Sequence, residues 1–178
     1  VASFDRIPDA LFGGQVRTRS SILLGSPSEK NEVHLLTTPM YRWFAHERDK
    51  LFSSINYINV DLIKNFRSEW PKIASDLQVS ILHRLFSMDV ALGDMISDHN
   101  SENIIYYSST AYNWLTATRK MPPVYDGDGN LIKQTKYGNL YFESEDDAWF
   151  ALSILTSKFT YWYWLVYGDG FDVTKRIL

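Results

Sequence analysis

Cysteine is absent from this 178-residue chain, and its absence excludes several kinds of site. Without thiols the chain can form no disulfide framework, no thiolate zinc site and no cysteine nucleophile. A reducing compartment is the default for such a sequence, so we expect a cytoplasmic protein.

Long hydrophobic runs are also missing. The longest apolar stretch, Phe159 to Tyr167, spans about nine residues and is interrupted by Thr160. A membrane-spanning helix needs roughly 20 apolar residues, so we expect no membrane partner. No secretory leader is visible, and because position 1 is not methionine we expect a piece of a longer protein.

The chain has no excess of positive charge, with 18 basic against 21 acidic side chains and a net charge of -3. A nucleic-acid partner would therefore have to be bound by a local basic cluster. Aromatic residues, in contrast, are abundant: six Trp, eleven Tyr and ten Phe. Either the core is rich in Trp and Tyr whose polar tips reach water, or some of these rings are exposed for binding.

Short strands and one helix are expected in the first half of the chain. We predict a strand at the start, a long loop containing Pro8 and Gly13, and strands at about 16–25 and 33–38. The 41–55 segment is predicted to be a helix, because its apolar residues would share one face. These residues are Phe44, Leu51, Phe52 and Ile55.

Two helices and further strands are expected in the second half. Ser75 and Gln78 have capping-box spacing, and apolar residues then repeat every three or four positions to about residue 97. A second capping box at 144–147 opens a helix over 145–167 that is apolar on nearly every face, which is typical of burial. Strands are expected at 103–107 and within 131–143. The sequence thus predicts the α+β class, with mixed sheet elements, a long amphipathic helix and a buried C-terminal aromatic-rich helix.

Familiar catalytic and metal-binding motifs are missing. The 126–130 segment resembles the opening of a calcium loop, but Leu131 and Tyr137 stand where Gly and Glu are required, so we expect a turn. No two histidines have the i, i+4 spacing of a helical metal pair, so we expect no metal site. No phosphate-binding glycine loop or nucleophile elbow is present, and we assign no catalytic or cofactor-binding residue.

Several segments, in the correct order, resemble one protein family. The Ser3–Leu24 segment resembles the region after the catalytic core of type IIG-like adenine-specific DNA methyltransferases of restriction-modification systems, and the Thr38–Tyr57 segment continues the match. Two later pieces are similar to the family's target-recognition region: Trp70–Ile73, and Ile105–Tyr107 with Tyr112 and Trp114. The final helix resembles the closing helix of the family, although Thr156 stands where asparagine is usual.

The resemblance implies a fragment that is inactive alone. Such enzymes bind S-adenosylmethionine through a glycine-containing loop and hold the flipped adenine with an Asn- or Asp-Pro-Pro-aromatic motif. Neither motif is present, because Pro122-Pro123 lies between Met121 and Val124. Residues 1–66 would be the end of the catalytic domain and residues 67–178 the target-recognition domain. Double-stranded DNA and the N-terminal catalytic part of the same polypeptide are the implied partners.

The resemblance also implies an aromatic side chain that stacks on the flipped base. Phe12 is the first candidate and Phe4 the second, since stacking on a ring offsets part of the cost of unstacking the base. The alternative is that these rings simply pack in a core. Arg17 and Arg19 alternate on a predicted strand, so both could hold phosphates or, alternatively, could be solvated surface residues.

A basic, aromatic stretch at 112–137 is the expected DNA-reading surface. Its basic residues outnumber Asp126 and Asp128, leaving a local charge of +2, and aromatic residues are interleaved with them. The predicted DNA contacts are Arg17, Arg19, Arg42, Tyr112, Trp114, Arg119, Lys120, Lys133 and Lys136. A solvated hairpin is the alternative. A different class of function also stays open, namely a protein-interaction module that docks a partner subunit without DNA contact.

Overall fold

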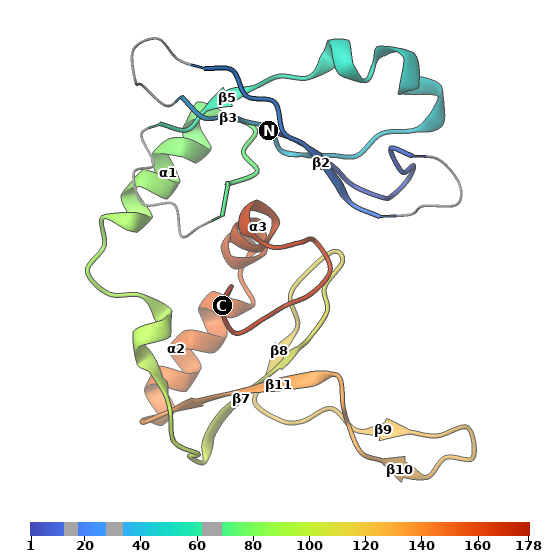
Figure 1. The fold of residues 1–178 in the computed structure, drawn as a ribbon. Helices are drawn as coiled ribbons and strands as arrows, with labels where there is room; N and C mark the ends of the chain where they lie inside the picture. Colours follow the sequence, from blue (N-terminus) through green and yellow to red (C-terminus); the bar gives the residue numbers. More distant parts are fainter. Residues whose placement is uncertain (13–17, 28–33, 62–68) are drawn as a thin grey trace. The chain divides into compact units, whose positions relative to one another are not determined.

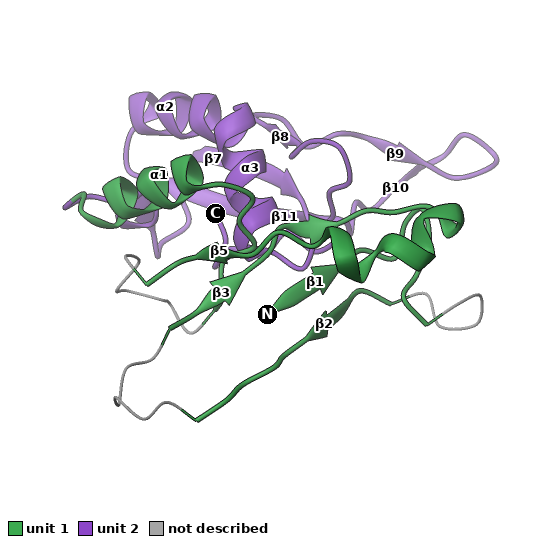
Figure 2. Ribbon diagram, turned by 90° about the horizontal axis from the view of Figure 1, so that it is seen from above, with its two compact units in different colours: residues 1–88 green, residues 89–178 purple. Residues whose placement is uncertain are grey.

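The structure is a computed structural model that describes residues 1–12, 18–27, 34–61 and 69–178, and it confirms the α+β class. The chain divides into two compact units, residues 1–88 and 89–178 (Figure 2). The helix over 76–86 therefore lies in the first unit, whereas the expected boundary after residue 66 grouped it with the second. Assignment of the two regions to catalytic and target-recognition domains stays a prediction. In the described part of the chain, no helix has the length and apolarity to cross a membrane.

Unit 1 is built around a short central strand, β1 (Ala2–Phe4) (Figure 2). Strand β1 pairs antiparallel with β2 (Ser20–Ile22) and parallel with β4 (Met40–Tyr41). All three β1 residues are buried, because the strand has a neighbour on both edges. A second small sheet pairs β3 (Leu36–Thr37) antiparallel with β5 (Ile58–Asn59). The core cluster of this unit consists of Ala2, Phe4, Leu11, Trp43 and Leu51.

The strand expected at 16–25 is shorter in the structure. Its first two residues lie outside the described part of the chain, and β2 pairs only from Ser20 to Ile22. The limit is set by β1, which offers three residues as partners. Leu23 and Leu24 follow the paired segment and are exposed.

The helix expected over 41–55 is wrong. After β4 the chain forms two 3₁₀ helices, η1 (Ala45–Lys50) and η2 (Phe52–Ser54). Trp43 is held outside a helix because its carbonyl accepts the amide of Asp9, and the Asp9 carboxylate accepts the amide of Ala45. These bonds to a distant segment occupy backbone groups that an α-helix would have used.

Helix α1 (Asp76–Phe86) begins where the capping box predicts, with Ser75 as N-cap, but it ends eleven residues before the expected end at 97. The Ser75 side chain makes no capping hydrogen bond, whereas the Gln78 side chain accepts the amide of Ala74. Beyond the helix, η3 (Leu92–Met95) leads into β6 (Ile96–Ser97), which pairs with another strand. Leu92 and Met95 pack against the core of unit 2, so their spacing reflects tertiary packing rather than a helix.

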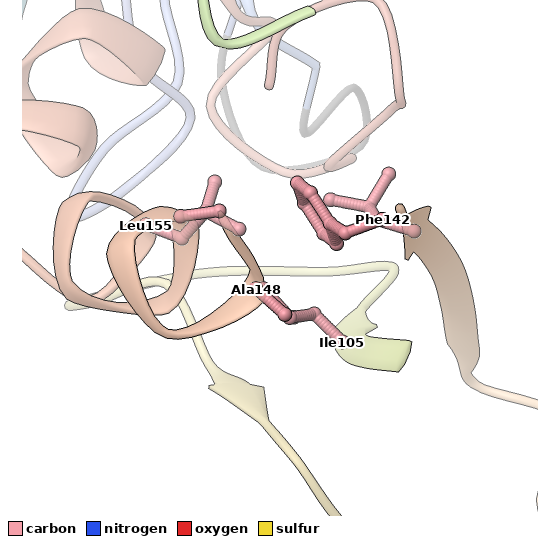
Figure 3. Packing of buried hydrophobic residues seen from close by; sticks show 6 residues of the cluster. Ile105, Phe142, Ala148 and Leu155 are labelled. Carbon is pink, nitrogen blue, oxygen red and sulfur yellow. The ribbon is translucent and has the colours of Figure 1, made fainter. Parts of the chain in front are cut away.

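Unit 2 is a four-stranded antiparallel sheet with helices on one face (Figure 1). Its strands run in the order β6, β11 (Tyr137–Phe142), β7 (Asn103–Ser108) and β8 (Ala117–Thr118), which confirms the expected strand at 103–107. Ile105, Leu140 and Phe142 project from the sheet onto helix α2 (Glu145–Leu155), where they contact Ala148 and Leu155 (Figure 3). A Cβ at Gly138 in β11 would meet the end of the Tyr107 ring, so a larger residue there would need the Tyr107 side chain to shift.

The terminal helix is divided in two. Helix α2 ends at Leu155 and α3 spans Lys158–Tyr167, because Ser157 is extended and accepts the amide of Thr160 as an N-cap. The predicted helix start is confirmed, since Ser144 is the N-cap and accepts the amide of Asp147. The expected burial on nearly every face is wrong. Trp164 is fully buried, but these short helices each present one side to solvent, with exposed Trp149, Phe150 and Phe159.

A separate hairpin joins β8 to β11. It pairs β9 (Val124–Tyr125) with β10 (Leu131–Ile132) and follows Pro122-Pro123. The expected turn at 126–130 is confirmed: the amide of Asp126 donates to the carbonyl of Asn130, and Gly129 adopts a φ of 84°. Only glycine adopts such a conformation without strain, so its position fixes the turn.

Candidate nucleic-acid interface

Phe12 ends an anchored segment of unit 1. Its ring is 69% exposed, as a base-stacking side chain must be. The residue before it, Leu11, is buried, and its carbonyl accepts a hydrogen bond of 3.0 Å from the guanidinium of Arg48. That guanidinium also lies 5.6 Å from the ring centroid of Trp43. Phe12 is therefore presented from a fixed base, and its role in stacking stays a prediction.

Phe4, the second stacking candidate, is wrongly placed for that role. Its side chain is 0% exposed in the core of unit 1, with ring centroids of Tyr41 and Phe52 at 6.2 and 5.9 Å. Leu11, Trp43 and Leu51 belong to the same core cluster, so the packing alternative accounts for Phe4. No base could reach the ring without opening this core.

Two of the predicted phosphate-binding arginines are held by one buried acid. The Asp5 carboxylate is almost fully buried and accepts Nε of Arg19 at 3.1 Å and Nε of Arg42 at 2.9 Å. The Arg19 side chain is only 17% exposed, so most of it is committed to this contact, whereas the Arg42 side chain is more than half exposed. Arg17 lies outside the described residues.

Asp5 is the residue that the sequence analysis missed. A charged side chain directly after three buried strand residues is the pattern that could have revealed it, because buried carboxylates are almost always paired. Its two arginines come from opposite sides of β1, one beside β2 and one after β4. Asp5, Arg19 and Arg42 therefore link β1 to its two neighbouring strands, β2 and β4, at the end of β1 that leads to Phe12.

The best-formed aromatic surface lies on the 109–116 loop of unit 2, between β7 and β8. Tyr112 and Trp114 are 51% and 67% exposed. The loop is closed by a hydrogen bond from the amide of Ser108 to the carbonyl of Thr116, and the Tyr112 carbonyl accepts the hydroxyl of Tyr161 at 2.7 Å. Both exposed rings thus stand on a loop whose backbone is bonded to its surroundings.

Lys136 lies beside this loop, because its carbonyl accepts the amide of Ser109 at 2.9 Å. The C-terminal segment after α3 contacts the same loop. The amide of Val173 donates to the carbonyl of Ser109, and the Tyr112 ring packs edge-on against Phe171 with ring centroids 5.5 Å apart. The structure therefore brings Tyr112, Trp114 and Lys136 to one end of the sheet.

Arg119 lies apart from this group. Its guanidinium is 5.3 Å from the ring centroid of Trp149 on α2, and the Trp149 indole donates to Glu145. One terminal nitrogen of Arg119 is buried with no hydrogen-bond partner. This stacking places Arg119 on the helix side of the sheet, so the structure does not unite it with Tyr112.

Lys120 and Lys133 are exposed and flank the β9–β10 hairpin, while the tip of the hairpin is acidic. The Asp126 carboxylate accepts the amide and the side-chain nitrogen of Asn130 and the amide of Asp128. These bonds, those from Asn130 first, lower the pKa of Asp126, so the tip stays negative near neutral pH. Phosphates would therefore be met by the base of the hairpin and repelled by its tip.

In the ranges that the structure describes, no three His, Asp or Glu side chains gather closely enough to hold a metal ion. Comparison with protein families, characterised proteins and solved structures found no match to this chain.

Proposed function

We propose that this chain is the DNA target-recognition part of an S-adenosylmethionine-dependent, adenine-specific DNA methyltransferase of a restriction-modification or related defence system in the cytoplasm. The observation that carries the proposal is the pair of exposed rings, Tyr112 and Trp114, on an anchored loop bonded to Lys136. Phosphate contacts position a protein on duplex DNA, and side chains that reach base edges read the sequence. In the 109–116 loop, Tyr112 and Trp114 provide aromatic faces for the bases, and Lys136 beside the loop provides positive charge for the phosphates.

In this proposal the chain recognises DNA, and a preceding part of the same polypeptide catalyses methylation. The cofactor and the Pro-Pro-aromatic motif belong to that part, so this chain alone has no methyltransferase activity. Unit 2 holds the duplex, and Phe12 of unit 1 offers its exposed ring to the extruded adenine. With Phe4 buried and Arg19 paired to Asp5, the contribution of the described part of unit 1 rests on Phe12 and Arg42.

Binding to a fluorescent duplex tests the proposal directly. Lys133→Gln and Lys136→Gln should each weaken binding uniformly across DNA sequences and reduce the slope of log affinity against log salt by about 1, because each removes one phosphate contact. Trp114→Ala should weaken binding without changing that slope, since a ring carries no charge. Fluorescence anisotropy at several salt concentrations measures both quantities.

Lys158→Gln is the matched control, because Lys158 is an exposed lysine at the start of α3 and is not among the predicted DNA contacts. It should leave duplex affinity unchanged. Equal losses for Lys158→Gln, Lys133→Gln and Lys136→Gln would contradict a localised DNA surface. The family assignment has its own test in the coding sequence upstream of Val1, where a glycine-containing cofactor loop followed by a Pro-Pro-aromatic motif is expected.

A protein-interaction module that docks a partner subunit is the second candidate. It is favoured by large apolar side chains that stand exposed on helices of both units, Leu77 of α1 and Phe150 of α2. This candidate predicts no affinity for duplex DNA at low salt, and therefore no difference in duplex binding between Lys136→Gln and the parent chain.

A further inference from the structure

The register of the unit 2 sheet assigns each strand residue to one of its two faces. Leu140 of β11 lies opposite Ile105 of β7, and both are fully buried against α2. Because side chains alternate along a strand, the neighbours of these residues project to the other face. That face, which we call the open face, consists of Ser97, Ile104, Tyr106, Ser108, Thr118, Tyr137, Asn139 and Tyr141.

The open face has no cover from the helices of its own unit. Helices α2 and α3 lie on one side of the sheet (Figure 1), where α2 contacts β7, β8 and β11. Asn139 is exposed and the other seven residues of the open face are partly exposed, whereas Ile105, Leu140 and Phe142 on the helix side are fully buried.

Tyrosines occupy the centre of the open face. Tyr106 lies directly opposite Asn139, so Tyr137 and Tyr141 are its diagonal neighbours on β11. Diagonal partners on adjacent strands are about 7–8 Å apart, which is within reach of aromatic side chains. The side-chain nitrogen of Asn139 donates to the hydroxyl of Tyr141 at 3.2 Å, so the two side chains are hydrogen-bonded to each other.

The chemistry of this face favours nucleobases over a protein partner. Ile104 is its one aliphatic side chain, the remaining residues carry hydroxyl or amide groups, and none is charged. A protein-docking face would be expected to offer more aliphatic area, whereas a base needs a flat ring to stack on and polar groups at its edge.

Positive charge lies at the border of the open face. Lys136 immediately precedes Tyr137, and the Lys120 carbonyl accepts the hydroxyl of Thr118, so both lysines stand next to open-face residues. Both lysine side chains are exposed. At the opposite end Ser97 donates to Glu143, so a phosphate backbone would follow the lysine end.

We propose that the open face binds single-stranded DNA, with successive bases stacked on Tyr106 and Tyr137 and the backbone along Lys120 and Lys136. The choice of DNA over RNA rests on the proposed function, in which unpaired bases arise when the duplex is opened. The duplex contacts of Trp114 and Lys133 lie outside the open face, so the two activities can be lost separately.

Anisotropy with a fluorescent 15-nucleotide oligo(dT) at low salt tests the inference on the full chain. Tyr106→Leu keeps a strand-compatible apolar side chain but removes the ring, and it should weaken oligo(dT) binding about tenfold, because stacking on an aromatic ring contributes a factor of this order per base. Tyr106→Phe keeps the ring and should bind within about twofold of the parent chain. Phe150→Ala removes an exposed aromatic on α2, on the other side of the sheet, and should bind like the parent chain.

Thermal unfolding of each variant establishes that its fold is retained, and Tyr137→Leu supplies a second test should Tyr106→Leu fail to fold. Absence of oligo(dT) binding, or equal binding by the parent chain, Tyr106→Leu and Tyr137→Leu, would overturn the inference. Tighter binding of oligo(U) than of oligo(dT) would overturn the choice of DNA. Loss of duplex binding with retained, Tyr106-dependent oligo(dT) binding would contradict the proposed function and leave this inference standing.

Discussion

At the residue scale, one acid determines how the sheet of unit 1 is fastened. Asp5 follows β1, and its carboxylate oxygens accept the amide of Arg6 and the side chains of Arg19 and Arg42. Buried acids are stable only when such partners replace the lost water. Arg19 and Arg42 therefore act first as structural residues, and only the exposed part of Arg42 is available to a ligand.

Asp5→Asn should lower the free energy of unfolding by about 1–3 kcal/mol, because it removes the charge from hydrogen bonds that two arginines make. Urea unfolding measures the loss. Asp49→Asn is the control, since Asp49 is an exposed acid in η1, and it should change stability by less than about 0.5 kcal/mol. Similar effects of the two substitutions would show that the Asp5 contacts do not stabilise the sheet.

Asp61 makes a pH-dependent contribution next to β5. Hydrogen bonds from the His34 ring at 2.6 Å and from the amide of Leu35 lower the pKa of Asp61 below its ordinary value. A carboxyl with a lowered pKa in the folded state stabilises that state above the unfolded pKa, about 3.9 for Asp. The contribution is lost as the pH falls from there through the lowered value.

The difference in unfolding free energy between the parent chain and Asp61→Asn should therefore be larger at pH 5 than at pH 3 and shrink as the pH falls below about 4. Urea unfolding of both proteins across pH 3–6 gives this difference. A difference that stays constant to the lowest pH would mean that Asp61 titrates alike in the folded and unfolded chains.

At the element scale, Ser75 and Ser144 both precede a helix with capping-box spacing, but only Ser144 makes a side-chain capping bond. Ser144 accepts the amide of Asp147 at 3.1 Å, whereas Ser75 makes no side-chain capping bond. Ser144→Ala should cost about 1 kcal/mol of stability, and Ser75→Ala no more than a few tenths. Thermal unfolding of the two variants gives the comparison, and equal losses would mean that capping by Ser144 contributes nothing measurable.

Local patterns predicted where elements begin better than where they end. Ser75 and Ser144 mark the starts of α1 and α2 correctly, because the residues that begin a helix are near neighbours in the chain. The expected continuation of α1 to residue 97 is excluded by β6, in which Ile96 pairs with Phe142, a residue distant in the sequence. The 41–55 helix failed for the same reason, since Asp9 bonds to Trp43 and Ala45 across the sequence.

The candidate site shows the same limit. Exposure of Phe12, Tyr112 and Trp114 follows the predicted loops, because rings on loops have few neighbours. The burial of Phe4 could not be predicted from sequence, since it depends on side chains from distant segments, Trp43, Leu51 and Phe52, that pack around it. The tyrosines of the open face could not be identified from the sequence, because their exposure depends on which side of the sheet the helices cover.

At the scale of the whole molecule, the net charge of -3 is an average over regions of opposite sign. Helix α2 begins with Glu145, Asp146 and Asp147, which complement the helix dipole. Exposed lysines lie instead beside the 109–116 loop and the base of the β9–β10 hairpin. An acidic chain can thus present a local basic surface to DNA.

The salt dependence of duplex binding tests this account most directly. With Lys120, Lys133 and Lys136 each neutralising one phosphate, log affinity should fall against log salt with a slope of about -2.7, because each contact releases counterions. Between 50 and 200 mM salt the affinity should fall about 40-fold. No binding at low salt, or an affinity that stays flat over this range, would contradict DNA recognition by this chain.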